Sequence, residues 1–239
     1  MIAKKIHLCW FSDDTYPVEI KVCIESWKRV LPDYEIRIWR MADARAIDMP
    51  YIHEALDARR WAFASDVVRF YAVYTEGGIY MDSDVFIYRR FDKFIPDDGF
   101  VTFNERIEDH WSDFGLQAAF FIGTKGNEFC RLMLDYYRAR HYINADGTQD
   151  NTISPYTMRA IAEDYGYRCD DSDVQHLGIL TVYPTHYLAP RKRYKVDDQT
   201  IGQHRVYGSW RRRKFGRRIE IALKHIYNLS KYYIFRVKS

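Results

Sequence analysis

Two aspartates, Asp82 and Asp84, stand one residue apart directly after the apolar run Ile79-Tyr80-Met81. Their like charges repel each other, and a divalent cation relieves this repulsion when both carboxylates turn toward it. Mg²⁺ and Mn²⁺ prefer carboxylate oxygens and usually complete their coordination with the phosphate oxygens of a substrate. The pair therefore indicates a site for a metal and a diphosphate, although the same spacing also occurs in solvated turns.

A second pair of charged residues, Asp66 and Arg69, lies three positions apart in a segment of helical character, so both side chains share one helix face. An exposed ion pair of this kind contributes only about 0–1 kcal/mol to stability. The neighbouring alanines and valines instead indicate a less exposed setting. There a guanidinium and a carboxylate can hold polyol hydroxyls or a phosphate through charge-assisted hydrogen bonds.

The segments around these residues predict an α/β domain that opens with strand, helix and strand. Residues 3–10 and 34–39 have strand patterns, and between them Pro17 lies near the start of a helix with one apolar stripe. Residues 57–75 predict one long helix. The pair Gly77-Gly78 ends it, because glycine tolerates the left-handed conformation found at helix C-termini.

The apolar run before Asp82 predicts a short central strand. Ligands of open α/β sheets gather beyond the carboxyl ends of strands, so both aspartates occupy a candidate binding position. Further strands are predicted at 99–103, 118–123 and 179–183, and further helices at 128–140 and 155–165.

Two groups of polar residues outside these motifs have simpler interpretations. His7, inside the first strand, is expected to be a core histidine. The acidic residues Glu105, Glu108 and Asp109 either meet an acceptor or belong to a solvated loop, and the solvated loop is the favoured interpretation.

Cysteine spacing and hydropathy argue against several classes of protein. The four cysteines are far apart and have no metal-ligand spacing, which argues against a zinc site and against a disulfide-rich secreted scaffold. No run reaches the roughly 18 apolar residues of a membrane span, and the N-terminal segment has no apolar signal core. The sequence therefore predicts a soluble protein of a reducing compartment, the cytoplasm.

Three segments resemble one known family. The segment WAFASDVVRFYAVYTEGGIYMDSDV (61–85) resembles the signature of DXD-containing glycosyltransferases, a group that includes bacterial capsular-polysaccharide sugar transferases and the yeast initiating α-1,6-mannosyltransferase. It is also similar to the catalytic domain of large clostridial glucosylating toxins. The stretch KKIHLCWFSDDTYPVEIKVCIESWKRVLPDYEIRIW (4–39) resembles the opening of the family, and HRVYGSW (204–210) resembles its closing His…Ser-Trp element.

The resemblance implies a GT-A fold, a Rossmann-like mixed sheet flanked by helices, over residues 1–210. It further implies metal-dependent transfer of a hexose from a nucleotide-diphosphate sugar, with retention at the anomeric carbon. A UDP-sugar is the favoured donor, and Mn²⁺ or Mg²⁺ the expected metal. The acceptor is expected to be a glycan or lipid-linked glycan in capsular or cell-surface polysaccharide synthesis.

The resemblance also implies roles for individual residues. Catalytic roles fall to Asp66, Arg69, Asp82 and Asp84. The donor is expected to contact Trp10, Ser65, Asp66, Arg69, Tyr80, Asp82, Ser209 and Trp210, with Trp10 on the nucleobase and the last two on the leaving diphosphate. The metal ligands are Asp82, Asp84 and His204. Gln117-Ala118-Ala119 stands where the family often has a small-residue motif led by Asn, which leaves the role of Gln117 open.

Residues 211–239 hold ten Lys or Arg against one acid, Glu220, whereas residues 1–210 have an acidic excess. Apolar residues at helical spacing in this tail predict a basic amphipathic helix, distinct from the catalytic domain 1–210. The helix either docks peripherally on the anionic inner face of a bacterial membrane, which is favoured, or packs on the domain.

Two other functions remain open. A sugar nucleotidyltransferase also uses paired carboxylates and a metal, but it releases pyrophosphate, and the sequence has no glycine-rich phosphate loop. A nucleic-acid-binding protein is suggested by the basic tail alone, and the acidic remainder of the chain argues against it.

Overall fold

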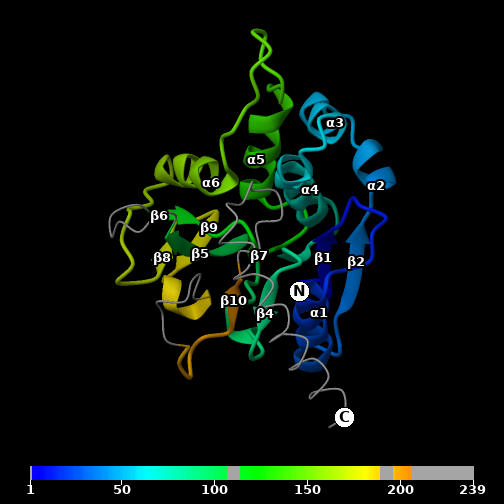
Figure 1. Cartoon of the computed structure of the whole chain (residues 1–239). Coiled ribbons are helices and arrows are strands. Elements are labelled where there is room, and N and C mark those ends of the chain that lie inside the picture. Colours follow the sequence, from blue (N-terminus) through cyan, green and yellow to red (C-terminus); the bar gives the residue numbers. More distant parts are fainter. Residues whose placement is uncertain (1, 107–113, 189–195, 206–239) are drawn as a thin grey trace, which may run out of the picture.

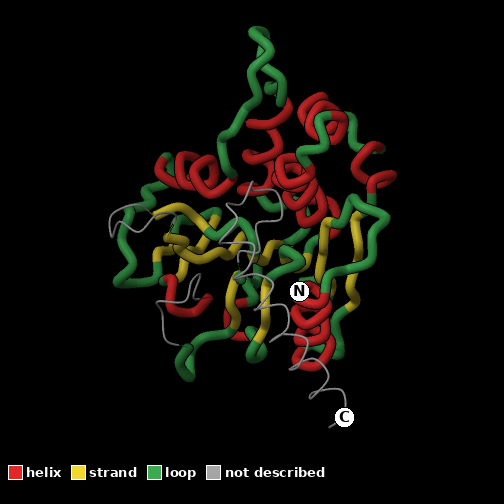
Figure 2. The backbone as a smooth tube through the Cα atoms, in the orientation of Figure 1, coloured by secondary structure: helices red, strands yellow, loops and turns green. Residues whose placement is uncertain are grey.

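The computed structural model describes residues 2–106, 114–188 and 196–205. Within these ranges the chain forms one mixed β-sheet with helices packed around it, and a second sheet of two short strands (Figures 1 and 2). Ser209, Trp210 and the basic tail 211–239 lie outside the described residues, as do Glu108 and Asp109. What the sequence predicts for them therefore stays a prediction.

The main sheet has the strand order β2-β1-β3-β7-β5-β9-β8, with β6 paired to β5. Its strands are β1 (Lys5–Cys9), β2 (Glu35–Trp39), β3 (Gly78–Met81), β5 (Phe100–Arg106), β6 (Phe114–Leu116), β7 (Phe120–Gly123), β8 (Gln175–His176) and β9 (Leu180–Tyr183). β1 is parallel to β2 and β3, whereas β7 runs antiparallel to both of its neighbours, β3 and β5. The second sheet pairs β4 (Val85–Ile87) with β10 (Gly202–His204).

The helices are α1 (Val18–Val30), α2 (Met41–Arg45), α3 (Pro50–Asp57), α4 (Trp61–Glu76), α5 (Glu128–Arg138) and α6 (Ser154–Glu163), with the 3₁₀ turns η1 (Asp92–Phe94) and η2 (Thr185–Leu188). Two apolar cores form around the sheet. The core with α3–α6 includes Tyr80, and the core with α1 includes Ile79 and Met81. This alternation follows from the two-residue period of a strand, and it buries β3 on both faces.

The opening strand–helix–strand prediction is confirmed. The apolar stripe of α1, with Ile20, Cys23, Ile24 and Trp27, is buried. His7 is buried as expected: its ring bonds to the carbonyl of Gly77 and accepts from the indole of Trp39. The strands and helices predicted downstream are present within a few residues of their expected ends.

The helix predicted over residues 57–75 is present as α4, but it begins later than predicted. α3 ends at Asp57 and α4 begins at Trp61. Between them Arg59 adopts a positive φ of 54°, which an α-helix does not allow. Residues 58–60 include no glycine or proline, so the sequence pattern does not reveal the break between the two helices.

The end of α4 requires both of its glycines. Gly77 has φ 67° and Gly78 has φ 115°. A Cβ atom at Gly77 would lie 2.9 Å from the backbone nitrogen of Lys125, and one at Gly78 would lie 2.6 Å from the carbonyl oxygen of Lys5. Both positions therefore need glycine, because each combines a positive φ with close backbone packing. The two residues connect the end of α4 directly to β3.

Among the described residues, none of the helices combines the length and the apolar composition needed to cross a bilayer.

Candidate active site

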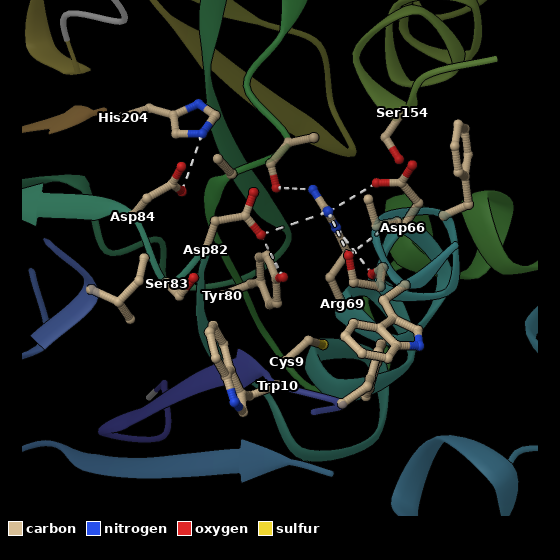
Figure 3. Close-up of a pocket in the computed structure, with 18 of the residues that line it drawn as sticks. Cys9, Trp10, Asp66, Arg69, Tyr80, Asp82, Ser83, Asp84, Ser154 and His204 are labelled. Atoms are coloured by element: carbon tan, nitrogen blue, oxygen red, sulfur yellow. Dashed lines mark hydrogen bonds and ion pairs between the residues drawn. The ribbon is translucent and has the colours of Figure 1, made fainter. Parts of the chain in front are cut away.

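A pocket of about 650 Å³ opens beyond the carboxyl ends of β1 and β3 and the start of β7 (Figure 3). Every predicted site residue within the described part of the chain lines it: Trp10, Ser65, Asp66, Arg69, Tyr80, Asp82, Asp84 and His204. The structure thus brings residues from β1, α4, β3, the turn after β3 and β10 to one place. Their individual roles remain predictions.

Asp82, Asp84 and His204 form a group that suits a metal ion. One ligand atom from each side chain lies within 4.8 Å of the other two. The turn after β3 makes this possible, because the amide of Val85 donates to the carbonyl of Asp82 at 3.0 Å and curls the chain between the aspartates. On a straight strand the two carboxylates would lie on one face but about 6.6 Å apart along it, and the turn lets both face one cavity.

β10 brings His204 to this group from a distant part of the sequence. His204 pairs with Val85 in the antiparallel β4–β10 sheet, and the amide of Arg205 donates to the carbonyl of Asp84 at 3.0 Å. The imidazole Nε2 then lies 3.4 Å from Asp84 Oδ1. Burial alone would lower the pKa of His204, but the nearby carboxylates of Asp84 and Glu105 outweigh burial and raise its pKa well above the ordinary value.

The chemistry of these side chains fits a divalent cation. Two carboxylates and one imidazole supply oxygen and nitrogen donors, and three protein ligands leave coordination positions for diphosphate oxygens and water. The negative charge of Asp82 and Asp84 also favours a cation between them, because Arg69 Nη2 lies 3.6 Å from Asp82, on the side of that carboxylate away from Asp84 (Figure 3).

Asp82 is held in one orientation by its neighbours. The hydroxyl of Tyr80 donates to Asp82 Oδ1 at 2.6 Å, and Arg69 Nη2 lies 3.6 Å from the same oxygen. The amide of Asp82 donates to the carbonyl of Ala119 at 2.8 Å, which ties the turn to the start of β7. Burial and the Asp82 charge raise the pKa of Tyr80 well above its usual range, so the phenol remains a donor.

Arg69 and Asp66 form a buried pair rather than a surface one, as their setting in the sequence indicates. Arg69 Nη2 lies 2.8 Å from Asp66 Oδ1, and the two side chains are only 6% and 13% exposed. The guanidinium also donates to the carbonyls of Ser65 and Ala118. Most of its hydrogen-bonding capacity is therefore used inside the protein, where it fixes the distance between Asp66 and the DXD turn.

Asp66 also joins α4 to α6. Ser154, at the N-terminus of α6, lies beside Asp66 (Figure 3), and the Asp66 carboxylate accepts hydrogen bonds from its amide and hydroxyl. Burial raises the pKa of Asp66 to about 6, against the opposing effect of Arg69. The carboxylate is thus a hydrogen-bond acceptor at neutral pH and gains a proton more readily than an exposed aspartate does.

Trp10 stands at the carboxyl end of β1 on the same pocket. Its indole nitrogen donates to the carbonyl of Asp14 at 3.2 Å, and its ring meets Tyr16 edge-to-face at 4.7 Å. These contacts fix a large aromatic ring at the pocket wall, where it suits a planar ligand group.

The structure gives Gln117 a place that the sequence left open. Its side chain is buried, and its Oε1 accepts from the amide of Ala119 at 2.9 Å. Ala118 and Ala119 in turn present their carbonyls to Arg69 and to the amide of Asp82. Gln117 therefore shapes the backbone behind the site and does not itself line the pocket.

The interpretation of Glu105 as part of a solvated loop is wrong. Glu105 belongs to β5, its side chain is 13% exposed, and it lines the pocket with its Oε1 3.6 Å from His204 Nδ1. The polar run Asn104-Glu105-Arg106 has no alternation of apolar residues, so the sequence hides the strand. The signal that could have found it is the strand predicted at 99–103, because the structure extends this strand through Glu105 as β5.

Comparison with known proteins places this site in a class. Residues 17–101 match the family described as the glycosyltransferase sugar-binding region containing DXD motif, and Asp82 and Asp84 lie inside the match. The protein is a glycosyltransferase with a DXD motif. No curated protein sequence matches the chain significantly.

Among solved structures, the PaToxG glycosyltransferase is similar with a TM-score of 0.52 and 20% identity, over 68% of this chain and 70% of that one. This likeness shows a mixed sheet with flanking helices of the GT-A type. Two weaker matches are a glycosyltransferase involved in glycosylation of the major capsid of PBCV-1 (TM-score 0.46, 15% identity, 84% of this chain and 92% of that one) and galactosyltransferase LgtC, solved with donor and acceptor sugar analogues (0.44, 12%, 84% and 86%).

Proposed function

We propose that the chain is a metal-dependent, retaining glycosyltransferase that moves a hexose from a nucleotide-diphosphate sugar, with a UDP-sugar favoured, to a glycan or lipid-linked glycan. The observation that carries the proposal is the convergence of Asp82, Asp84 and His204 at the wall of a pocket large enough for a nucleotide sugar. The family match over residues 17–101 supports the same activity.

The position of each side chain in the pocket suggests its role in the proposed reaction. Asp82, Asp84 and His204 would hold Mn²⁺ or Mg²⁺, which supplies positive charge for the leaving diphosphate. Trp10 at the end of β1 offers its ring to the nucleobase. Asp66, fixed by Arg69 and by the start of α6, accepts hydrogen bonds from hydroxyls of the donor sugar.

The reaction exchanges one carbon–oxygen bond for another. The acceptor hydroxyl oxygen bonds to the anomeric carbon, the bond from that carbon to the diphosphate oxygen breaks, and the hydroxyl proton passes to the leaving diphosphate. The carboxylates of the pocket support attack from the leaving-group face, because each has another partner. Asp82 and Asp84 would serve the metal, Asp66 is bonded to Arg69 and Ser154, Glu105 faces His204, and Asp14 accepts from Ser12. Retention of configuration then needs no covalent enzyme intermediate.

The proposal extends to a cellular setting. Capsular or cell-surface polysaccharide synthesis, in the cytoplasm at the inner face of a bacterial membrane, is supported by the family resemblance and by the basic composition of the tail 211–239. Co-sedimentation of the full chain with anionic vesicles, compared with neutral ones, tests this setting.

The proposed activity is tested with the full-length chain, Mn²⁺ and a panel of nucleotide sugars. We expect release of a nucleoside diphosphate from one donor. The rate of release should fall about 100-fold or more in Asp84→Asn, because the variant loses a charged ligand of the metal that stabilises the leaving diphosphate, and each 1.4 kcal/mol of lost stabilisation costs tenfold in rate. Asp97→Asn is the matched control, since Asp97 is exposed and does not line the pocket.

Two results would overturn the proposal. One is a folded Asp84→Asn variant with the activity of the parent chain. The other is release of pyrophosphate in place of a nucleoside diphosphate, which is the product of a sugar nucleotidyltransferase.

A further inference from the structure

Glu105 is a little-exposed carboxylate whose position at the pocket calls for an explanation. It lies near the carboxyl end of β5, opposite Gly115 of β6, and only 13% of its side chain is exposed. Removing a carboxylate from water costs free energy unless a charged or hydrogen-bonding partner compensates. Among the described residues, its ion-pair partner is the imidazole of His204.

The His204 ring lies between two carboxylates, one on each nitrogen. Nε2 lies 3.4 Å from Asp84 Oδ1, and Nδ1 lies 3.6 Å from Glu105 Oε1. Within the described ranges Nδ1 is buried and has no hydrogen-bond partner, since 3.6 Å is just too long for one. A small approach of Glu105 is enough to satisfy this nitrogen.

The geometry also decides which nitrogen faces a metal. The group of atoms within 4.8 Å contains Asp82, Asp84 and His204, and it does not contain Glu105. Nε2, on the Asp84 side, is therefore the ligating atom, and it must present its lone pair. A neutral imidazole then carries its proton on Nδ1, which points at Glu105.

We propose that Glu105 is a positioning residue for the metal ligand His204. It accepts the Nδ1–H hydrogen bond, fixes the tautomer and the ring orientation, and so holds Nε2 toward the cation between Asp82 and Asp84. This inference rests on the proposed metal-dependent function. Carboxylates that hold ligating histidines in this way typically strengthen metal binding 10–100-fold.

The test measures the affinity for Mn²⁺ alone, by the electron paramagnetic resonance signal of free Mn²⁺, on the full-length chain. We expect Glu105→Ala to weaken binding about 10–100-fold. Glu105→Gln should weaken it less, because a carboxamide oxygen still accepts from Nδ1–H. Glu128→Gln, which removes an exposed carboxylate on α5, should bind as the parent chain does. Thermal unfolding confirms that each variant is folded.

A double-mutant cycle separates positioning from other roles. His204→Ala removes the group on which Glu105 acts, so adding Glu105→Ala to it should change Mn²⁺ affinity no further. Because the role is confined to the metal, excess Mn²⁺ should restore the nucleoside diphosphate release of Glu105→Ala to within a few-fold of the parent value.

Different failures have different meanings. Parent-like Mn²⁺ affinity in folded Glu105→Ala, additive losses in the double variant, or a rate that excess Mn²⁺ does not restore would each overturn the role of Glu105 while leaving the proposed function standing. A parent chain that binds no Mn²⁺ would overturn the metal-dependent function and this inference together.

Discussion

Tyr80 lines the pocket and also orients Asp82. Its ring lies between the guanidinium of Arg69, 5.0 Å from the ring centre, and the stacked ring of Phe121, and its hydroxyl donates to Asp82. Tyr80→Phe removes only that hydroxyl. We expect Mn²⁺ affinity to fall about tenfold, because Asp82 loses the contact that orients it, and the free energy of unfolding to fall by about 0.5–1.5 kcal/mol.

Tyr34→Phe is a matched control for Tyr80→Phe. The Tyr34 hydroxyl is also buried, and among the described residues it has no hydrogen-bond partner. Its removal should leave Mn²⁺ affinity unchanged and should not lower stability. Equal effects of the two substitutions on Mn²⁺ affinity would contradict an orienting role for Tyr80.

At the scale of single residues, the sequence predicts the side chains that line the pocket better than it predicts the residues that hold them in position. The carboxylates, Trp10 and His204 could be chosen because their types and order match a known pattern. Glu105 and Gln117 could not, because their roles depend on the folded chain: Glu105 meets His204 from a distant strand, and Gln117 holds the backbone before β7 in the shape that reaches Arg69 and Asp82.

At the scale of elements, the β4–β10 pair decides whether His204 reaches the aspartates. A Cβ at Gly202 would lie 2.8 Å from the carbonyl oxygen of Phe86 and 2.9 Å from Ile87 Cδ1. Gly202→Val should therefore push β10 off β4 and weaken Mn²⁺ binding about tenfold or more, with all three ligands still present in the sequence. The same resonance measurement of free Mn²⁺ detects this loss.

Gln203→Ala serves as the control in the same strand, because it keeps the backbone pairing and removes only a side chain that bonds to Tyr88. It should retain the metal affinity of the parent chain. Parent-like binding in Gly202→Val would show that His204 reaches the aspartates without the β4–β10 pair.

The predictable elements are those with local signals. α1 has a stripe, α4 has a glycine stop, and β3 has an apolar run, and all three were foreseen. β4 and β10 have three residues each and exist only through their pairing with one another, so no periodicity reveals them. The start of α4 at Trp61 is predicted too early, at Asp57, because the residues between them include no glycine or proline to interrupt the helical pattern.

At the scale of the whole molecule, His7 makes the stability of the fold depend on pH. It joins β1 to β2 and to the end of α4, because Nδ1 accepts from the Trp39 indole while Nε2 bonds to the Gly77 carbonyl. Both bonds need the neutral ring with its proton on Nε2. Burial lowers the pKa of His7 below its ordinary value, so protonation favours the unfolded chain.

The stability contributed by neutral His7 should be fully present above about pH 6.5 and lost as the pH falls below that value. We expect urea unfolding, without divalent metal, to show a smaller loss of stability from pH 7 to 5.5 in His7→Gln than in the parent chain. His204, whose pKa is raised, contributes stability that is fully present below about pH 6.5 and is lost as the pH rises, so the two pH dependences occupy separate ranges. Equal pH dependence of His7→Gln, the parent and the exposed-site control His176→Gln would contradict this assignment.

The placement of His204 on β10 also has a consequence for the order of events during synthesis. A growing chain exposes Asp82 and Asp84 long before β10 leaves the ribosome, and closing so long a loop is slow compared with local folding. The nascent protein thus passes through a stage in which the main sheet can assemble while its acidic turn lacks the third ligand. Full metal affinity would be acquired only when β10 docks on β4, which makes it a marker of that late step in folding.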